Sequence, residues 1–174
     1  MLFQVSCVSE AEVTRKINVS ALAPVIGTLY PPPYHEPCLS RGRSRIGDAA
    51  GLTQFGVNLL RLPSGAWSSQ RHWHTEADEL VYVLAGEVTL VTDEGPELLR
   101  AGEAAGFKGA DANGHCLRNL SDSDALVLEI GSRIKSDAAH YPDVDLFSPP
   151  AGGAIYEHKD GTPYEDLQRR AAKR

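Results

Sequence analysis

Residues 65–86 read GAWSSQRHWHTEADELVYVLAG, and this stretch decides the fold and the chemistry that the chain can support. In a β-strand, side chains two residues apart point to the same face, so His72 and His74 project together while Trp73 projects away. A tight turn after His74 can bring Glu79 back beside the two imidazoles. Two imidazoles and one carboxylate held on rigid strands are the first three ligands of a mononuclear divalent metal site.

The surrounding sequence has the hydrophobic pattern of an all-β domain. From residue 51 to residue 132, short apolar runs alternate with turns that contain glycine. The runs include TQFGVNLLRL, ELVYVL, EVTLVT, HCLRNL and ALVLEI. Strands of this length and spacing are typical of a β-sandwich or a β-barrel. We therefore expect one barrel domain over residues 51–132.

A fourth metal ligand should come from a strand on the opposite side of that barrel. The best candidate is His115 in the segment NGHCLRN, because it stands at the head of another apolar strand. Its distance in sequence from His72 would let it close the site from the other side.

The spacing of these residues resembles the first sequence motif of the cupin superfamily. In that motif, glycine and a short spacer precede His-x-His, and three or four residues then lead to a glutamate and, six residues later, to a second glycine. In this chain the places are taken, in order, by Gly65, His72, His74, Glu79 and Gly86. The first spacer has six residues here, one more than the usual five.

A second stretch resembles the second cupin motif, which runs from a glycine through a proline and another glycine to His-x3-Asn. Gly102 begins it, and His115 and Asn119 end it. Lys108 stands in the proline slot and Ala110 in the glycine slot, and His115 arrives two residues late. The turn before His115 is therefore expected to be longer than in the family.

The resemblance implies a double-stranded β-helix, or jelly roll, with a metal in the mouth of the cupin barrel and a homodimeric assembly. Phrases outside the motifs, such as HYPDVDL and HKDGTPY, are similar to small single-domain bacterial cupins, some of which carry the label of sugar-phosphate isomerase. That label is an analogy at the level of fold. The implied cofactor is one divalent transition metal ion: Mn, Fe, Ni, Co or Zn.

Such an ion, held by three histidines and one glutamate, would keep two positions for a small oxygen-rich molecule. As a Lewis acid it would polarise a carbonyl group, which favours isomerase, epimerase or lyase chemistry on a polyhydroxy or oxo-acid substrate. Two alternatives stay open at this point. One is an Fe(II)-dependent dioxygenase, and the other is a cupin that binds a small ligand without catalysis.

Strand parity suggests further residues that could touch the substrate. They are Gln70, Asn58, Asn113 and Glu129. The favoured alternative for each is a hydrogen-bonded structural role, since buried polar groups usually satisfy neighbouring groups. Arg71 and Arg118 alternate with metal ligands and should point away from the barrel interior. This argues against a phosphate bound tightly at the metal, so we expect a small oxygen-rich ligand without specifying a phosphate.

The flanks of the barrel differ in composition. Residues 1–50 contain LYPPPYHEP and SRGRSRIGD, which favour an extended N-terminal arm packed on the barrel over a helix or central strand. Residues 133–174 are expected to form a C-terminal tail of the same domain, with a short helix near its end in PYEDLQRRAAKR.

The totals exclude several classes of partner. The net charge of −6, with no basic cluster except at the C-terminus, argues against nucleic acid and against anionic membrane surfaces. The sequence has neither a secretory signal pattern nor a transmembrane run. Cys7, Cys38 and Cys116 are an odd number at irregular spacing, which favours reduced thiols. We expect a cytoplasmic protein.

Overall fold

The computed structural model describes residues 16–172, and within that range twelve β-strands dominate the fold. The strands are β1 (Val25–Ile26), β2 (Gly42–Arg45), β3 (Phe55–Leu62), β4 (Trp73–His74), β5 (Glu79–Ala85), β6 (Glu87–Thr92), β7 (Gly95–Arg100), β8 (Ala104–Phe107), β9 (Cys116–Arg118), β10 (Ala125–Ser132), β11 (Ala139–Tyr141) and β12 (Leu146–Ser148). The helical segments are short, namely η1 (Val19–Ala21), η2 (Glu36–Cys38) and α1 (Ile46–Ala49). The prediction of an all-β fold is confirmed.

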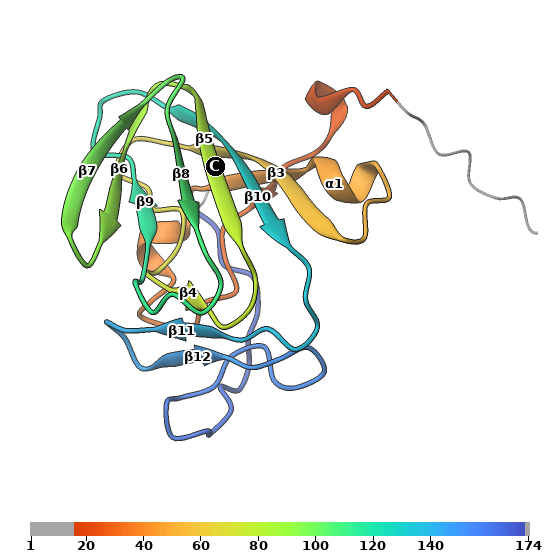
Figure 1. Ribbon diagram of the computed structural model, residues 1–174, viewed down its shortest axis with the longest axis vertical. Helices are drawn as coiled ribbons and strands as arrows, with labels where there is room; N and C mark the ends of the chain where they lie inside the picture. The colour runs from red at the N-terminus through yellow and green to blue at the C-terminus, as the bar shows by residue number, and fades with distance from the viewer. Residues whose placement is uncertain (1–15, 173–174) are drawn as a thin grey trace, which may run out of the picture.

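The strands form one large and two small antiparallel sheets. The large sheet has the order β1-β2-β3-β10-β5-β8, and the small sheets have the orders β7-β6-β9 and β12-β11-β4. Figure 1 shows β7, β6 and β9 standing opposite the large sheet, while β4, β11 and β12 lie across one end of the barrel. This end is the mouth where the candidate ligands were expected.

The barrel core follows from the alternation of apolar side chains along the strands. On β5, Val81 and Val83 are buried while Tyr82 between them is exposed. The same alternation on the other strands yields one core cluster of Leu60, Leu62, Ala66, Val81, Val83, Val88, Leu90, Leu99, Leu117, Ala125 and Val127. Each fully buried Leu or Val stabilises the fold by about 1.5–3 kcal/mol, so this core holds the two facing sheets together.

Asn119, the last residue of the second motif, is a fully buried structural clamp. Its amide nitrogen donates to the carbonyl oxygens of Leu62 and Ser123, both at 2.7 Å, and its side-chain oxygen accepts from the N–H of Ser121. These bonds tie the end of β3 to the turn that leads into β10. All its polar atoms are satisfied within the protein, so it is unavailable to a ligand.

The N-terminal arm is more deeply integrated than the sequence suggested. In the described part of residues 1–50, β2 lies between β1 and β3 within the large sheet, and α1 is helical. The expectation of an extended arm without helix or internal strand was therefore wrong for residues 42–49. The cause is backbone pairing with the barrel, because β2 continues the antiparallel ladder from Gly42 opposite Arg61 to Arg45 opposite Asn58.

The C-terminal tail packs on the domain, but the predicted helix is not found among residues 163–172. Arg170 instead exchanges two backbone hydrogen bonds with Thr28, each 2.9 Å long, and the N–H of Ala172 donates to the carbonyl of Leu39. Asp166 has a φ of +52°, which is incompatible with a right-handed helix. Pairing with the arm therefore outweighs the local helix preference of this segment.

Two further findings concern the described residues. Cys38 and Cys116 are buried free thiols, while Cys7 lies outside the described range. Between residues 16 and 172, none of the helices has the length and apolar character needed to span a membrane.

Candidate metal centre

A short antiparallel contact at the barrel mouth brings three histidines together. The backbone N–H groups of His72 and His115 donate to each other's carbonyl oxygens at 3.1 and 2.8 Å. β4 carries His74 to the same face as His72, so the imidazole centroids lie 5.1 Å apart for His72 and His74 and 4.9 Å apart for His72 and His115. The alternation of side chains along the extended backbone therefore places His72 and His74 on one face, as the sequence predicted.

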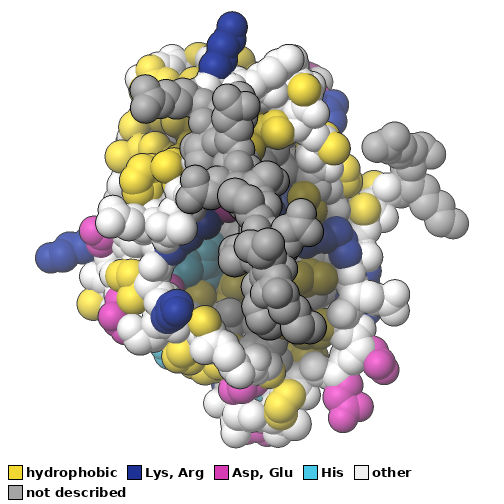
Figure 2. Space-filling model, turned by 90° about the vertical axis from the view of Figure 1, so that its right-hand side faces the viewer, with side chains coloured by type: hydrophobic (Ala, Val, Ile, Leu, Met, Phe, Trp, Pro, Cys, Tyr) yellow, Lys and Arg dark blue, Asp and Glu magenta, His cyan; other side chains and the backbone are white. Residues whose placement is uncertain are grey.

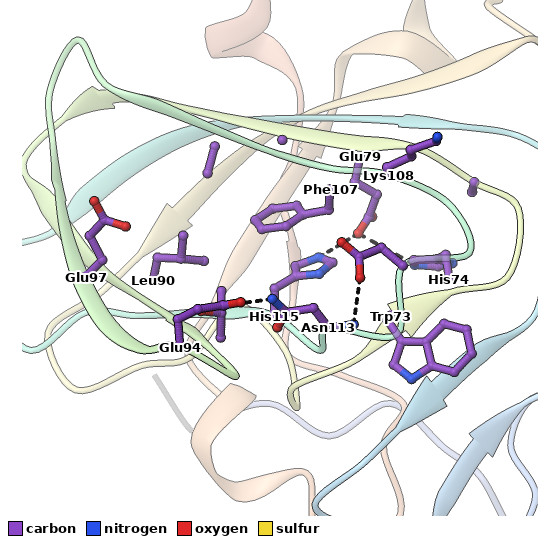
Figure 3. A pocket seen from close by; sticks show the side chains of 15 residues that line it. Trp73, His74, Glu79, Leu90, Glu94, Glu97, Phe107, Lys108, Asn113 and His115 are labelled. Carbon is purple, nitrogen blue, oxygen red and sulfur yellow. Dashed lines mark hydrogen bonds and ion pairs between the residues drawn. The ribbon is translucent and has the colours of Figure 1, made fainter.

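The carboxylate of Glu79, at the start of β5, is the point on which the three imidazoles converge. Its Oε2 lies 2.9 Å from Nε2 of His115, 3.6 Å from Nε2 of His74 and 3.7 Å from Nε2 of His72. Figure 3 shows Glu79, His74 and His115 pointing toward one another. The structure thus brings together all four residues that the sequence suggested as ligands.

Hydrogen bonds on the far side of the rings set the orientation of two imidazoles. Nδ1 of His72 donates to the carbonyl of Gln70 at 3.0 Å, and Nδ1 of His74 lies 2.6 Å from Oδ2 of Asp137. With the proton held on Nδ1, the Nε2 lone pair of each ring faces Glu79. The remaining ring, His115, stacks on Phe107 with centroids 3.5 Å apart, and its buried Nδ1 has no partner among the described residues.

Asp137 is a functional candidate that the sequence analysis missed. The N–H groups of Glu76 and Ala77 donate to its Oδ1 at 2.8 and 3.1 Å, and the hydroxyl of Thr75 does so at 3.2 Å. Burial opposes ionisation, but hydrogen bonds from Glu76, His74 and Ala77 outweigh it and lower the pKa of Asp137. A carboxylate is therefore fixed behind His74. Its 63-residue separation from His74 left no local signal in the sequence.

The charge states at neutral pH suit metal binding. Burial alone would raise the pKa of Glu79, but the hydrogen bond from His115 and the neighbouring imidazoles hold it at about 2. Burial is the main cause that lowers the pKa of His72 to about 4, although Glu79 pulls in the opposite direction. The site therefore offers an ionised carboxylate and a neutral imidazole, the forms in which these groups bind metals. The chemistry of the donor set fits a divalent transition ion.

Two cavities meet at this cluster from different sides. The larger has a volume of about 630 Å³ and is lined by His72, Glu79 and His115. We call it the arginine-lined cavity, because four arginines also line it: Arg41, Arg43, Arg45 and Arg133. The smaller, of about 340 Å³, is lined by His74, Glu79 and His115 and by the acids Glu94, Glu97 and Asp111, and we call it the acidic cavity. Figure 3 shows the side chains that line the acidic cavity.

The structure separates the four residues suggested as substrate contacts. Asn58 and Glu129 face each other across β3 and β10, and both line the arginine-lined cavity. Asn113 lines the acidic cavity, where its side chain bonds Glu94 and the N–H of Asp93. Gln70 is buried, its amide donates to the carbonyl of Tyr34 at 2.7 Å, and it lines neither of the two cavities.

The arginines of the larger cavity were not predicted either, because they lie outside the two motifs. As expected, Arg71 and Arg118 point away from the mouth: Arg71 pairs with Asp143 and Asp93, and Arg118 stacks on Trp67. Three of the four cavity arginines, namely Arg41, Arg43 and Arg45, come instead from the arm. Their signal was present in the alternating run RGRSR at residues 41–45, which in a strand places every second side chain on one face.

Comparison with known proteins gives a consistent result. The family description "Cupin domain" matches residues 58–131. A solved structure from Silicibacter pomeroyi, described as a sugar phosphate isomerase from a cupin superfamily, is 39% identical, covers 88% of this chain and 99% of its own, and superposes with a TM-score of 0.81. No curated protein matches the sequence.

Two further solved structures are more distant. A protein from Acidithiobacillus ferrooxidans, provisionally named a sugar phosphate isomerase, is 27% identical over 75% of this chain and 83% of its own, with a TM-score of 0.65. A polyketide cyclase from Streptomyces resistomycificus is 16% identical over 68% of this chain and 78% of its own, with a TM-score of 0.55. The second likeness concerns the fold alone.

Proposed function

The chain belongs to the cupin superfamily, and from this premise we propose that it is a metal-dependent enzyme acting on a small polyhydroxy or oxo-acid substrate by isomerase, epimerase or lyase chemistry. The observation that supports the proposal is the convergence of three imidazole Nε2 atoms on Oε2 of Glu79 at the wall of a cavity of about 630 Å³. Cavities of this size accommodate small-molecule ligands.

The proposed ligands are His72, His74, Glu79 and His115, and the proposed cofactor is one divalent transition ion among Mn, Fe, Ni, Co and Zn. When bound, such an ion would supply a Lewis acid that polarises a substrate carbonyl. Asp137 would orient His74 as a ligand through the hydrogen bond at Nδ1.

The other polar groups of the arginine-lined cavity would bind and orient the substrate. Asn58 offers an amide donor and acceptor for hydroxyl groups. Glu129 is held by two hydrogen bonds from Arg43, at 2.6 and 2.7 Å, which fixes its carboxylate beside the cavity. Burial raises the pKa of Tyr30 and of Tyr156, so both hydroxyls stay protonated at neutral pH and can donate to substrate oxygens.

The relatives favour the isomerase form of this proposal. The proteins from Silicibacter pomeroyi and Acidithiobacillus ferrooxidans, at 39% and 27% identity, are both described as sugar phosphate isomerases. The polyketide cyclase shares only the fold, which shows that cupin barrels host unrelated reactions. The substrate class therefore has to be argued from this chain's own cavity.

The proposal is tested by elemental analysis followed by a substrate screen. Protein purified without chelator and without nickel affinity resin should contain about one transition ion per chain. Incubated in D₂O under nitrogen with aldoses, ketoses, their phosphates and sugar acids, it should interconvert one compound and place solvent deuterium next to the carbonyl, as followed by NMR.

Each competing function gives a different result in the same screen. Turnover that requires air would identify the Fe(II)-dependent dioxygenase and contradict the proposal. Saturable binding of a compound with no product under either atmosphere would identify a ligand-binding cupin without catalysis. Full turnover after removal of every transition ion with chelator would contradict the metal-dependent part.

A further inference from the structure

Three arginines of the arm line the same cavity as the candidate metal ligands. In the run from Arg41 to Arg45, every second residue is arginine; Arg41 directly precedes β2, and Arg43 and Arg45 lie on one face of its extended backbone. All three line the arginine-lined cavity, and Arg133, just beyond β10, adds a fourth. Figure 2 shows histidine side chains within a hollow whose edges carry Lys and Arg.

The cavity has fewer free carboxylates than guanidinium groups. Besides Glu79, which belongs to the candidate metal centre, the described lining contains two acids, Glu129 and Asp48. Glu129 forms a bidentate pair with Arg43. Asp48 pairs with Arg133, and it also lies 3.7 Å from Arg45. Both acids are therefore already engaged.

Of the four arginines that line this cavity, Arg41 is the one that forms no ion pair with an acid among residues 16–172. It is only 7% exposed, so its charge is largely removed from water. Within the described chain its guanidinium donates to neutral groups only: Nε to the carbonyl of Gly27 at 3.4 Å and Nη2 to the hydroxyl of Thr28 at 3.1 Å. It also lies 5.5 Å from the ring centre of Tyr30. A buried cation without a counter-charge is unfavourable unless an anion joins it.

We infer that the arginine-lined cavity contains a binding site, centred on Arg41, for the anionic end group of the substrate, either a carboxylate or a phosphate monoester. Both groups present a pair of anionic oxygens that a guanidinium can bind with two N–H donors. Nη1 of Arg41 makes no hydrogen bond to the described residues and is the donor available to the anion. The anion site itself does not require a metal, whereas its role in substrate binding rests on the proposed function.

The negative charge of the acidic cavity favours entry of the anion from the arginine-lined cavity. The acidic cavity carries Glu94, Glu97 and Asp111 against the single cation Lys108. An anion approaching from that side would be repelled, whereas the arginine-lined cavity would attract it. A substrate with one anionic end and one carbonyl end would therefore bind with the anion at Arg41 and the carbonyl at the candidate metal centre.

Calorimetric titration of the full chain tests this site. Sodium phosphate and sodium malonate are the probes, each used with and without Mn²⁺. We expect at least one probe to bind the metal-free wild type, and Arg41→Gln to weaken it at least tenfold. Arg61→Gln is the matched control, because Arg61 pairs with Asp124 at the surface outside the cavity, and it should bind like the wild type. The stronger probe identifies the anionic group as phosphate or carboxylate.

Failure of the two proposals can be told apart. Retained Mn²⁺ binding with no binding of either anion would overturn the anion site and leave the proposed function standing. Anion binding that depends on Arg41, in a protein that binds none of the divalent ions of Mn, Fe, Ni, Co and Zn, would support the anion site and overturn the metal-dependent function. Equal anion affinity in folded Arg41→Gln and wild type would also overturn the inference.

Arg41 is buried, so its replacement by Gln could prevent folding. In that case the wild-type crystal structure with the bound probe decides the question. Density for phosphate or malonate within hydrogen-bond distance of the Arg41 guanidinium supports the site. Density for the probe only elsewhere on the protein overturns it.

Discussion

At the level of single residues, the hydrogen bond between His74 and Asp137 is the feature that most clearly distinguishes a ligand site from a chance cluster. A carboxylate behind a ligating imidazole fixes the tautomer and raises the basicity of the ring. We predict that Asp137→Asn weakens the binding of Zn²⁺ or Mn²⁺ by about 10-fold to 100-fold, measured by competition with a chelating dye.

The chain offers a matched control for this substitution. Asp145 accepts a 2.7 Å hydrogen bond from Nδ1 of His158 at the surface. This is the same kind of Asp–His pair as Asp137 and His74, but it lies outside the arginine-lined cavity. Asp145→Asn should leave metal affinity unchanged. An equal effect of both substitutions, or none at Asp137, would show that the Asp137 hydrogen bond does not support the site.

Ala110 illustrates how a departure from the family motif is accommodated. It stands in a glycine slot and keeps the backbone of a glycine, with a φ of +66°, a region that strains residues with a Cβ. We predict that Ala110→Gly raises the free energy of unfolding by about 0.5–1 kcal/mol, measured by urea denaturation. Ala101→Gly, at an exposed turn position without positive φ, should lower stability instead. A destabilising Ala110→Gly would mean that this strain is absent in solution.

At the level of elements, the paired tail depends on a close approach at Gly27. A Cβ at this position would lie 1.9 Å from the carbonyl oxygen of Arg170, so only glycine lets the tail pair with Thr28. We predict that Gly27→Ala releases the tail and speeds tryptic cleavage after Arg169 and Arg170 at least several-fold, followed by mass spectrometry.

Gly51→Ala is the control for this prediction. Gly51 has a similar positive φ of +68°, but a Cβ there would meet nothing within 4 Å. The control therefore carries the same backbone strain without the collision. Equal cleavage rates in the two variants would mean that the tail is not held by the contact at Gly27.

The elements also show which parts of the site could be predicted from sequence. His72, His74 and Glu79 follow from strand parity and one turn, so local pattern places them correctly. His115 lies on a strand distant in sequence and reaches them only when the barrel closes. Its place in the site was predicted from the resemblance to the second cupin motif. Asp137 reaches His74 through the pairing of β4 with β11, a long-range contact that no local spacing reports.

The two flanks were misjudged for a related reason. Proline and glycine in residues 17–48 favour irregular backbone, yet β2 gains a hydrogen-bonded partner in β3 that outweighs this tendency. The terminal segment has a helical composition, yet its backbone pairs with Thr28. In both cases tertiary pairing decides the structure, and the pairing of β2 with β3 carries Arg43 and Arg45 to the cavity.

At the level of the whole molecule, an apolar face of the large sheet is left uncovered in the described chain. Tyr82 and Leu84 on β5 are 39% and 46% exposed, and Tyr82 stands opposite Leu128 on β10, which in turn stands opposite Leu59 on β3. Contiguous exposed apolar side chains mark association surfaces. We predict a homodimer through this face, since twofold self-association is the commonest assembly of soluble proteins.

Sedimentation equilibrium checks this prediction. The wild type should have twice the mass of the chain, and Tyr82→Glu with Leu84→Glu should have the mass of one chain. Leu98→Glu serves as the control, because Leu98 is similarly exposed on β7 in the other sheet and should leave the dimer intact. A monomeric wild type at micromolar concentration would contradict the homodimer.

The proposed chemistry depends on one ion being held by four side chains at the mouth of the barrel. The most direct measurement is an anomalous difference map from crystals of Zn²⁺-loaded protein. We predict one strong peak about 2.0–2.2 Å from Nε2 of His72, His74 and His115 and from the carboxylate of Glu79. Absence of a peak there at saturating Zn²⁺, or a strong peak held only by other residues, would contradict the four-ligand metal site.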